Sequence, residues 1–206
     1  MNRRFPTTAA IGTLAALLLT VPAFAAPLNV GAKAPDFTLP ATLAGKDFSF
    51  SLQKALAKGP VVLYFFPAAY TQGCDIEAHT FSTHSAQFAK AGASIIGVSE
   101  NSIATLNKFE VDPNFCAGKF PIASDPNGNV GAKYGVPRIP PQKGVKTIHG
   151  KTITHGFFAR TTFVINRDGK VVAMFSTRLD HIKPAQHVTK SLAIVRKMKT
   201  RNSSAL

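Results

Sequence analysis

The sequence predicts one α/β domain in which a central mixed β-sheet is flanked by helices. Short apolar runs typical of buried strands alternate along the chain with segments of helical periodicity. The last elements are a strand–turn–strand hairpin and a helix, so part of the sheet must be antiparallel. With 206 residues, of which 45% are hydrophobic and 17% charged, the chain can bury a sizeable core, and no Pro/Gly/Ser-rich linker divides it.

Residues 1–25 have the features of a secretory signal peptide. Two arginines precede an apolar run over residues 9–21, and Ala-Phe-Ala at positions 23–25 forms a cleavage pattern. The run is shorter than the ~20 residues of a membrane-spanning helix, which favours cleavage over a retained anchor. We therefore expect a mature domain at residues 26–206 that is exported, into a bacterial periplasm.

The first elements of the domain lead to a central strand. Residues 47–51 alternate between polar and apolar side chains, which is typical of an edge strand, and residues 52–57 can form one or two helical turns. Lys58-Gly59-Pro60 then breaks the chain. The unbroken apolar run at residues 61–66 predicts a buried strand that stops at Pro67.

The next predicted helix carries Cys74 in its first turn. Ala78, Phe81, Ser85 and Phe88 follow at helical spacing and would face the sheet. Free N–H groups and the helix macrodipole favour thiolate over thiol at such a position. The alternative is a buried cysteine that acts as a small hydrophobic residue, but the polar loop before the helix favours a reactive one.

The second half of the chain continues the alternation. A helix capped by Ser102 is expected to run toward Cys116, and the segment 136–158 is less regular. An Asp-Gly turn joins the two strands of the closing hairpin. The remaining predicted elements are strands at 94–99, 121–126, 161–165 and 171–175, a short helix at 127–134 closed by Gly135, and a final helix at 184–199.

Three segments resemble one enzyme family. Pro67-x-x-x-Thr71-x-x-Cys74 resembles the active-site loop of peroxiredoxins of the alkyl hydroperoxide reductase/thiol-specific antioxidant superfamily, and T-x-G-C-x-x-E at 71–77 is similar to their bacterioferritin-comigratory-protein branch. Residues 31–39 and 160–170 resemble other segments of these proteins. The resemblance covers roughly residues 31–199 and implies a thioredoxin-like fold and a thiol-dependent peroxidase for hydrogen peroxide and organic hydroperoxides.

The resemblance also implies a set of roles. Cys74 would attack the peroxide, Thr71 would orient it, and the backbone N–H groups of Gly73 and Cys74 would be further donors. Pro67 would shape the loop and limit water near the sulfur, in addition to ending the strand. Arg160 would hold the thiolate with its fork of donors, whereas without the resemblance it would be an ordinary arginine at a strand edge.

Two further residues have roles with alternatives. Glu77 would support Arg160, or it is only a carboxylate suited to the start of a helix. Cys116 would resolve the oxidised Cys74 by forming an intramolecular Cys74–Cys116 disulfide. Alternatively, the two cysteines would form a permanent structural disulfide that stabilises the fold by roughly 4 kcal/mol. We expect the two thiols to lie apart in the reduced protein, so that helix ends must unwind to join them.

Charge and composition limit the partners. The formal net charge is +14, and residues 126–167 contain no acidic side chain. We expect a solvated basic surface with a weak contact to anionic polymers or lipids, and no nucleic-acid binding. No cofactor or metal is expected, since no phosphate loop or metal-spaced cluster appears, and the chain would be a monomer or weak dimer.

Two other function classes remain open. A non-enzymatic exported binding protein on the same fold would carry a static disulfide and a basic docking surface. A thiol–disulfide exchanger ranks last, because the chain has no C-x-x-C. For the peroxidase, a thioredoxin-like protein or another thiol would be the reductant.

Overall fold

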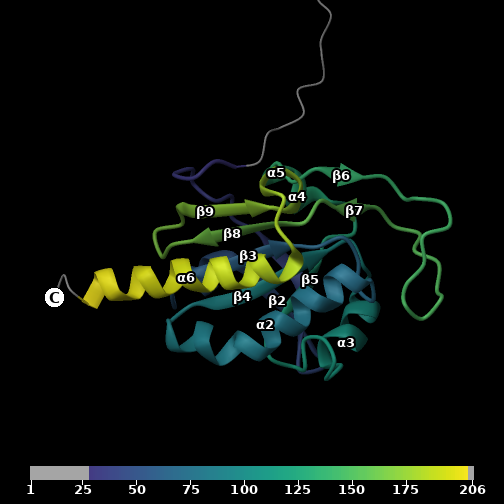
Figure 1. Ribbon diagram of the computed structural model, residues 1–206, viewed down its shortest axis with the longest axis horizontal. Helices are drawn as coiled ribbons and strands as arrows, with labels where there is room; N and C mark the ends of the chain where they lie inside the picture. The colour runs from purple at the N-terminus through teal and green to yellow at the C-terminus, as the bar shows by residue number, and fades with distance from the viewer. Residues whose placement is uncertain (1–27, 204–206) are drawn as a thin grey trace, which may run out of the picture.

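The computed structural model describes residues 28–203, with the signal-peptide prediction falling outside this range. A seven-stranded mixed sheet runs through the molecule in the order β2-β1-β5-β4-β3-β8-β9 (Figure 1). β3, β4 and β5 are parallel, and the other pairings are antiparallel. The strands are β1 (Thr38–Leu43), β2 (Lys46–Ser51), β3 (Val61–Phe65), β4 (Ser94–Ser99), β5 (Ile122–Ser124), β8 (Thr161–Ile165) and β9 (Val171–Ser176).

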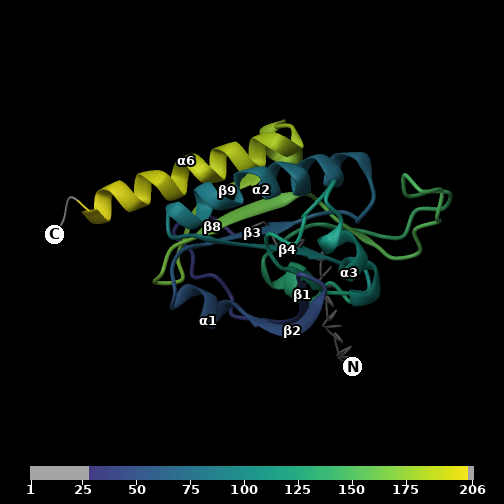
Figure 2. The same ribbon diagram turned by 90° about the horizontal axis from the view of Figure 1, so that it is seen from below.

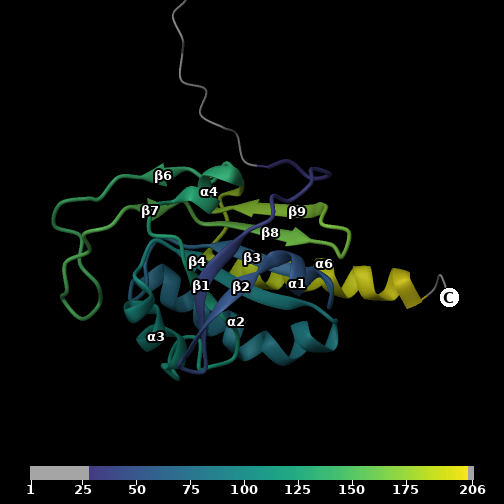
Figure 3. The ribbon, with the colours of Figure 1, turned by 180° about the vertical axis from the view of Figure 1, so that it is seen from behind.

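Helices cover both faces of the sheet (Figures 2 and 3). One face packs against α2 (Gln72–Lys90), α3 (Ile103–Val111) and α6 (Pro184–Ser203). The other is covered by the shorter α1 (Leu52–Leu56) and α4 (Asn129–Lys133) and by the chain before β1. α5 (Thr177–Asp180) joins β9 to α6. The predicted α/β architecture, with a central mixed sheet flanked by helices, is confirmed.

The central strand β3 is buried because both of its faces lie in the core. Val62 and Tyr64 pack beneath α2 and α6, whereas Val61, Leu63 and Phe65 pack on the opposite face. None of them exposes more than 1% of its surface. This explains the continuous apolar run in the sequence, since a strand covered on both faces has no polar side. The end of β3 is thus held in the core through Phe65, and the candidate site begins just after this residue.

Several elements differ from the sequence prediction, and β1 and α3 are the most informative. β1 was not predicted; it contains Pro40, which lacks the N–H that a central strand would use, and yet it pairs with both β2 and β5. α3 was expected to reach toward Cys116 but ends at Val111. Asp112, its C-cap, is extended because the following Pro113 disfavours helical backbone in the residue before it. Cys116 therefore lies in a turn and not at a helix end, which corrects that expectation.

The less regular segment forms an excursion, residues 140–156, that projects from one end of the sheet (Figure 1). Its base is a two-residue pairing of β6 (Arg138–Ile139) with β7 (Phe157–Phe158). Arg138 donates to both carboxylate oxygens of buried Glu100, at 2.7 and 2.8 Å. Near its tip, the Ile148 N–H donates to the carbonyl of Tyr70 at 2.8 Å. Within residues 28–203 no helix is long and apolar enough to cross a bilayer.

Candidate active site

The strand register brings Arg160 to the start of α2. β8 runs antiparallel to β3, and Thr161 is paired with Phe65, the last residue of β3. Arg160 directly precedes Thr161, so it lies beside the loop that leaves β3. Cys74 is the third residue of α2, which begins where that loop ends. Two segments distant in sequence thus meet at one edge of the sheet, as expected for Cys74 and Arg160.

Arg160 bridges Cys74 and Glu77. Its Nη2 donates to the Cys74 sulfur at 3.2 Å, and its Nη1 donates to Oε2 of Glu77. Cys74 and Glu77 are three residues apart in α2 and so share the face turned to the core. The three side chains are buried, with 2% of Cys74, 0% of Glu77 and 9% of Arg160 exposed. A planar guanidinium can serve two acceptors at once, which an ammonium cannot do in this geometry.

The buried charges at this site depend on one another. Burial raises the pKa of the Glu77 carboxyl to about 7, and the charge and hydrogen bond of Arg160 offset only part of this rise. Burial alone would lower the pKa of Arg160, but the charges of Glu77 and Cys74 raise it above its usual value. Arg160 is therefore a permanent cation held against the sulfur. The alternative of an arginine in solvent at a strand edge is wrong.

The loop before α2 is held in a defined shape. Thr71 is the N-cap residue, and its hydroxyl donates to the carbonyl of Ala68 at 2.8 Å, which leaves its oxygen able to accept a bond. The Cys74 N–H donates to the carbonyl of Thr71 at 2.8 Å, so a bound substrate would have to share this donor. Pro67 is half-buried at the loop start. At Gly73 a Cβ atom would lie 3.2 Å from Nη2 of Arg160, so the missing side chain leaves room for the guanidinium.

Asn101 is a positioning residue that the sequence analysis missed. Its side-chain oxygen accepts the Ala69 N–H at 2.9 Å and the Ser99 hydroxyl at 2.7 Å. Its Nδ2 contacts Nε2 of His155 in the excursion at 2.8 Å. Because β3 and β4 are parallel, the segments that follow them meet at one edge. A polar residue just after the second apolar strand was therefore a usable signal.

His187 lies behind Arg160 and was also missed. Its two ring nitrogens contact the hydroxyls of Thr162 and Thr177, each at 2.9 Å. The Thr177 N–H donates to the carbonyl of Arg160 at 3.2 Å. Burial and the nearby Arg160 charge lower the pKa of His187 to about 4, with Asp180 opposing the shift. A neutral imidazole thus supports the segment that carries the guanidinium.

Cys116 is buried and free, as is Cys74. Burial raises the pKa of the Cys116 thiol well above its usual value, and the carboxylates of Glu110, Asp75 and Asp112 add to the effect. Its neighbour Phe115 stacks on Phe109, with ring centroids 4.8 Å apart. Both cysteines border the same apolar core beneath α2 and α3. The two thiols are therefore unpaired in this structure.

Within the part of the chain that the structure describes, no group of three or more His, Cys, Asp or Glu side chains could hold a metal ion. The groups gathered at this end of the strands are the Cys74 sulfur, the Arg160 guanidinium and the loop around them. A buried thiol beside a fixed cation is suited to nucleophilic attack on a small electrophile.

Comparisons with known proteins agree with this geometry. The profile of the AhpC/TSA family matches residues 30–174. A putative peroxiredoxin of Mycobacterium tuberculosis is 34% identical over 173 residues, covering 84% of this chain and 99% of the relative. The crystal structure of peroxidoxin BcpB from the same organism is similar with a TM-score of 0.65 at 33% identity, covering 82% of this chain and 96% of that one. A structure of the Xanthomonas campestris bacterioferritin comigratory protein, determined to study its alkyl peroxide reduction activity, is similar with a TM-score of 0.60 at 28% identity. The match covers 78% of this chain and 92% of that one.

Proposed function

Because the chain belongs to the AhpC/TSA family of peroxiredoxins, and is therefore a thiol-dependent peroxidase with a peroxide substrate and a thiol reductant, we propose that Cys74 is its peroxidatic residue. The single observation that carries this is the 3.2 Å contact between Nη2 of Arg160 and the Cys74 sulfur. The same matches do not favour the alternative of a non-enzymatic binding protein.

The proposed first step is attack of the Cys74 thiolate on one oxygen of the peroxide. An S–O bond forms as the O–O bond breaks, and the second oxygen leaves with the electron pair and takes up a proton as water or an alcohol. Arg160 stabilises the charge that develops on the oxygens, because its donors are already in place. The Thr71 oxygen accepts the peroxide O–H, and Gly73 leaves the space in which guanidinium and substrate meet.

The proposed second step uses Cys116. Its sulfur attacks the sulfenic acid of Cys74, water leaves, and an intramolecular disulfide forms. Since both thiols are buried and unpaired, the turn at Cys116 and the start of α2 must open first. A thioredoxin-like protein or another thiol then reduces the disulfide and returns both thiols. Glu77 is a support residue in this scheme, because it holds Arg160 without contacting the sulfur.

The substrate range proposed is hydrogen peroxide together with organic hydroperoxides. Support comes from the likeness to the Xanthomonas protein.

For the assembly state we propose a monomer or weak dimer, which sedimentation of the reduced and oxidised protein would test. A concentration-independent larger oligomer would contradict it.

A stoichiometric titration tests the two cysteine roles. One equivalent of peroxide is added to the reduced protein, and mass spectrometry follows the products. The wild type should lose both thiols quickly and gain one intramolecular disulfide. Cys74→Ser should not react, whereas Cys116→Ser should stop at the sulfenic acid of Cys74. Slow and equal loss of both thiols, at the rate of a model peptide, would refute the assignment.

We also propose that the chain is exported and cleaved after residue 25. The support is the apolar run with its Ala-Phe-Ala pattern. Cell fractionation with N-terminal sequencing should find a periplasmic protein that begins at Ala26. A cytosolic protein that keeps residues 1–25 would refute export.

A weak contact of the basic surface with anionic lipid is a related proposal, and it requires vesicle binding that disappears at high salt.

A further inference from the structure

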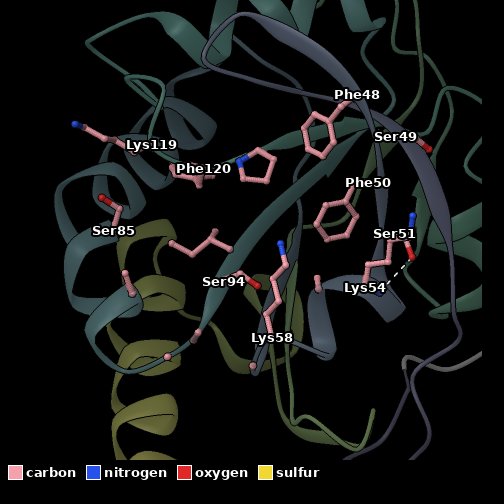
Figure 4. Close-up of a pocket in the computed structure, with 17 residues that line it drawn as sticks. Phe48, Ser49, Phe50, Ser51, Lys54, Lys58, Ser85, Ser94, Lys119 and Phe120 are labelled. Atoms are coloured by element: carbon pink, nitrogen blue, oxygen red, sulfur yellow. Dashed lines mark hydrogen bonds between the residues drawn. The ribbon is translucent and has the colours of Figure 1, made fainter.

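A cavity of about 630 Å³ lies far from the candidate active site, between the β1–β2 hairpin and the C-terminal end of α2 (Figure 4). Its apolar walls include Phe48 and Phe50 of β2, Ile95 of β4 and Phe120. Along α2, Cys74 is eleven residues before Ser85 in the cavity wall, a distance of roughly 16 Å at the rise of an α-helix. The volume is in the usual range for small-molecule sites.

The cavity exists because the β1–β2 hairpin diverges from the sheet. β1 pairs with β5 through only two residues, Ala41 and Thr42. β4 in turn pairs with β5 only from Gly97 onward. The space left between the hairpin and the first half of β4 is not filled by another strand.

The main chain of Ile95 is turned toward this space. Ser94 N–H donates to the Pro60 carbonyl before β3, and Gly97 N–H donates to the Pro121 carbonyl before β5. Backbone groups of a parallel strand alternate between its two neighbours, so those of Ile95 point to the β5 side. The pairing with β5 has not yet begun there, and Pro121 has no N–H to offer. The Ile95 N–H is thus a donor without a strand partner among residues 28–203.

The cavity is also positively charged. Lys54, Lys58 and Lys119 line it, and no carboxylate does. The three ammonium groups have no ion-pair partner within the described part of the chain. In Figure 4, Lys58 extends toward the middle of the cavity between Ser94 and Phe50, whereas the amino group of Lys119 points away from it. Lys58 is therefore the cation that an occupant of the cavity would meet.

We propose that this cavity binds a small aromatic carboxylate. The carboxylate would pair with Lys58 and accept the N–H of Ile95, and its ring would pack against Phe48, Phe50 and Phe120 in offset or edge-to-face contact. The ammonium that extends into the cavity and one main-chain donor match a single carboxylate. The three rings favour a planar apolar body over an inorganic anion. The proposal uses none of the residues assigned to peroxide reduction.

Calorimetric titration with 2-naphthoate tests the proposal on the reduced protein. One molecule should bind per chain, and the uncharged 2-naphthylmethanol and inorganic phosphate should each bind at least tenfold more weakly. Lys58→Gln should lower the affinity for naphthoate at least tenfold. The matched control is Lys133→Gln, which removes the same charge from an exposed position of α4 that does not line the cavity and should leave the affinity within twofold. Equal losses in the two variants, or no saturable binding, would overturn the proposal.

A second variant tests the aromatic wall. Phe48 is 40% exposed on edge strand β2, so Phe48→Ala should fold normally. The variant should bind naphthoate with severalfold lower affinity, and its affinity for phosphate should be unchanged. If Phe48→Ala binds naphthoate as the wild type does, the aromatic part of the assignment is wrong. Peroxide titration of Lys58→Gln and Phe48→Ala should match the wild type. Cys74→Ser, in turn, should bind naphthoate normally. Failure of the naphthoate site can therefore be told apart from failure of the proposed peroxidase function.

Discussion

Arg160 joins two residues of the site through two different nitrogens. Nη2 serves the sulfur of Cys74 and Nη1 serves the carboxylate of Glu77. The positive charge alone is therefore not what the site requires. The fork matters as well, because it fixes the guanidinium plane on Glu77 while leaving one edge for sulfur and substrate.

Arg160→Lys should keep the charge and lose the fork. One ammonium cannot reach both acceptors, and a hydrogen bond to a charged group is worth about 1.5–3 kcal/mol, so the rate of Cys74 oxidation should fall roughly tenfold to a hundredfold. Stopped-flow measurement with hydrogen peroxide checks this. Arg167→Lys is the control, since Arg167 is exposed and among residues 28–203 its side chain donates only to the Ala57 carbonyl. A rate within twofold of the wild type for Arg160→Lys would show that charge suffices.

His187 gives a pH dependence of known sign. Its pKa is about 4 in the folded protein against an ordinary 6.5, because burial first and then Arg160 oppose its charge. The unfolded chain therefore takes up this proton first as pH falls. Stability from His187 is complete above pH 6.5 and is lost between pH 6.5 and about 4. At about 1.4 kcal/mol per pH unit, this amounts to roughly 3 kcal/mol.

Urea denaturation of the wild type and His187→Gln measures this effect. The difference in unfolding free energy between the two should shrink by a few kcal/mol as pH is lowered from 7.5 to 4. The comparison is needed because Glu77 and Asp75 act with the opposite sign: burial raises their pKa values, so they favour the folded state as pH falls. A difference that does not change with pH would contradict the buried neutral imidazole.

At the level of elements, the excursion at 140–156 is tied to the rest of the protein at few points. Arg138 is half exposed but covers the buried carboxylate of Glu100, and Asn101 and Tyr70 provide two further bonds. The ring of His149 also packs on that of Tyr70, with centroids 5.0 Å apart. The excursion is therefore coupled to the active-site loop through Tyr70.

Arg138→Gln should loosen the excursion. It leaves the Glu100 carboxylate buried without a charge partner, which is costly even where one side of the pair is exposed. Trypsin should then cut at Lys143, Lys146 or Lys151 about three- to tenfold faster, since cleavage follows the population of the open segment. Arg167→Gln removes one arginine from an exposed loop and is the control. Equal cleavage of the two variants would mean that this ion pair does not hold the excursion.

The elements with strong apolar patterns could be predicted from the sequence, and those that depend on tertiary contacts could not. The pattern alone gave β3, β4, the closing hairpin, α2 and α6 within a few residues. β1 was missed because Pro40 argues against a strand, and the short β6–β7 pairing contains Arg138, which is anchored on Glu100 far away in the sequence. In the site, Cys74, Thr71 and Arg160 were found through a motif, whereas Asn101 and His187 act by position and carry no local signal of comparable strength.

At the scale of the whole molecule, the proposed catalytic cycle requires part of the core to move. Cys116 is completely buried, and its turn is held by the stack of Phe115 on Phe109 and by the edge of Tyr70 on Phe115, at 5.5 Å between centroids. Ala117 follows with a left-handed φ of +50°, an uncommon conformation for a residue with a Cβ. Its N–H donates to the Asp112 carbonyl at 2.9 Å. This turn is thus compact and carries backbone strain.

Formation of the Cys74–Cys116 disulfide should therefore open two segments together. Hydrogen exchange measured by mass spectrometry should become faster at residues 68–80 and 110–120 after one equivalent of peroxide, and dithiothreitol should reverse the change. β8 and β9, which contain neither cysteine, should exchange as before. Cys116→Ser, which can reach only the sulfenic acid, should keep the slow exchange of the reduced protein at 110–120. If the oxidised wild type forms the disulfide and both segments stay protected, the two sulfurs meet without local unfolding, and the turn at Cys116 is no obstacle to the cycle.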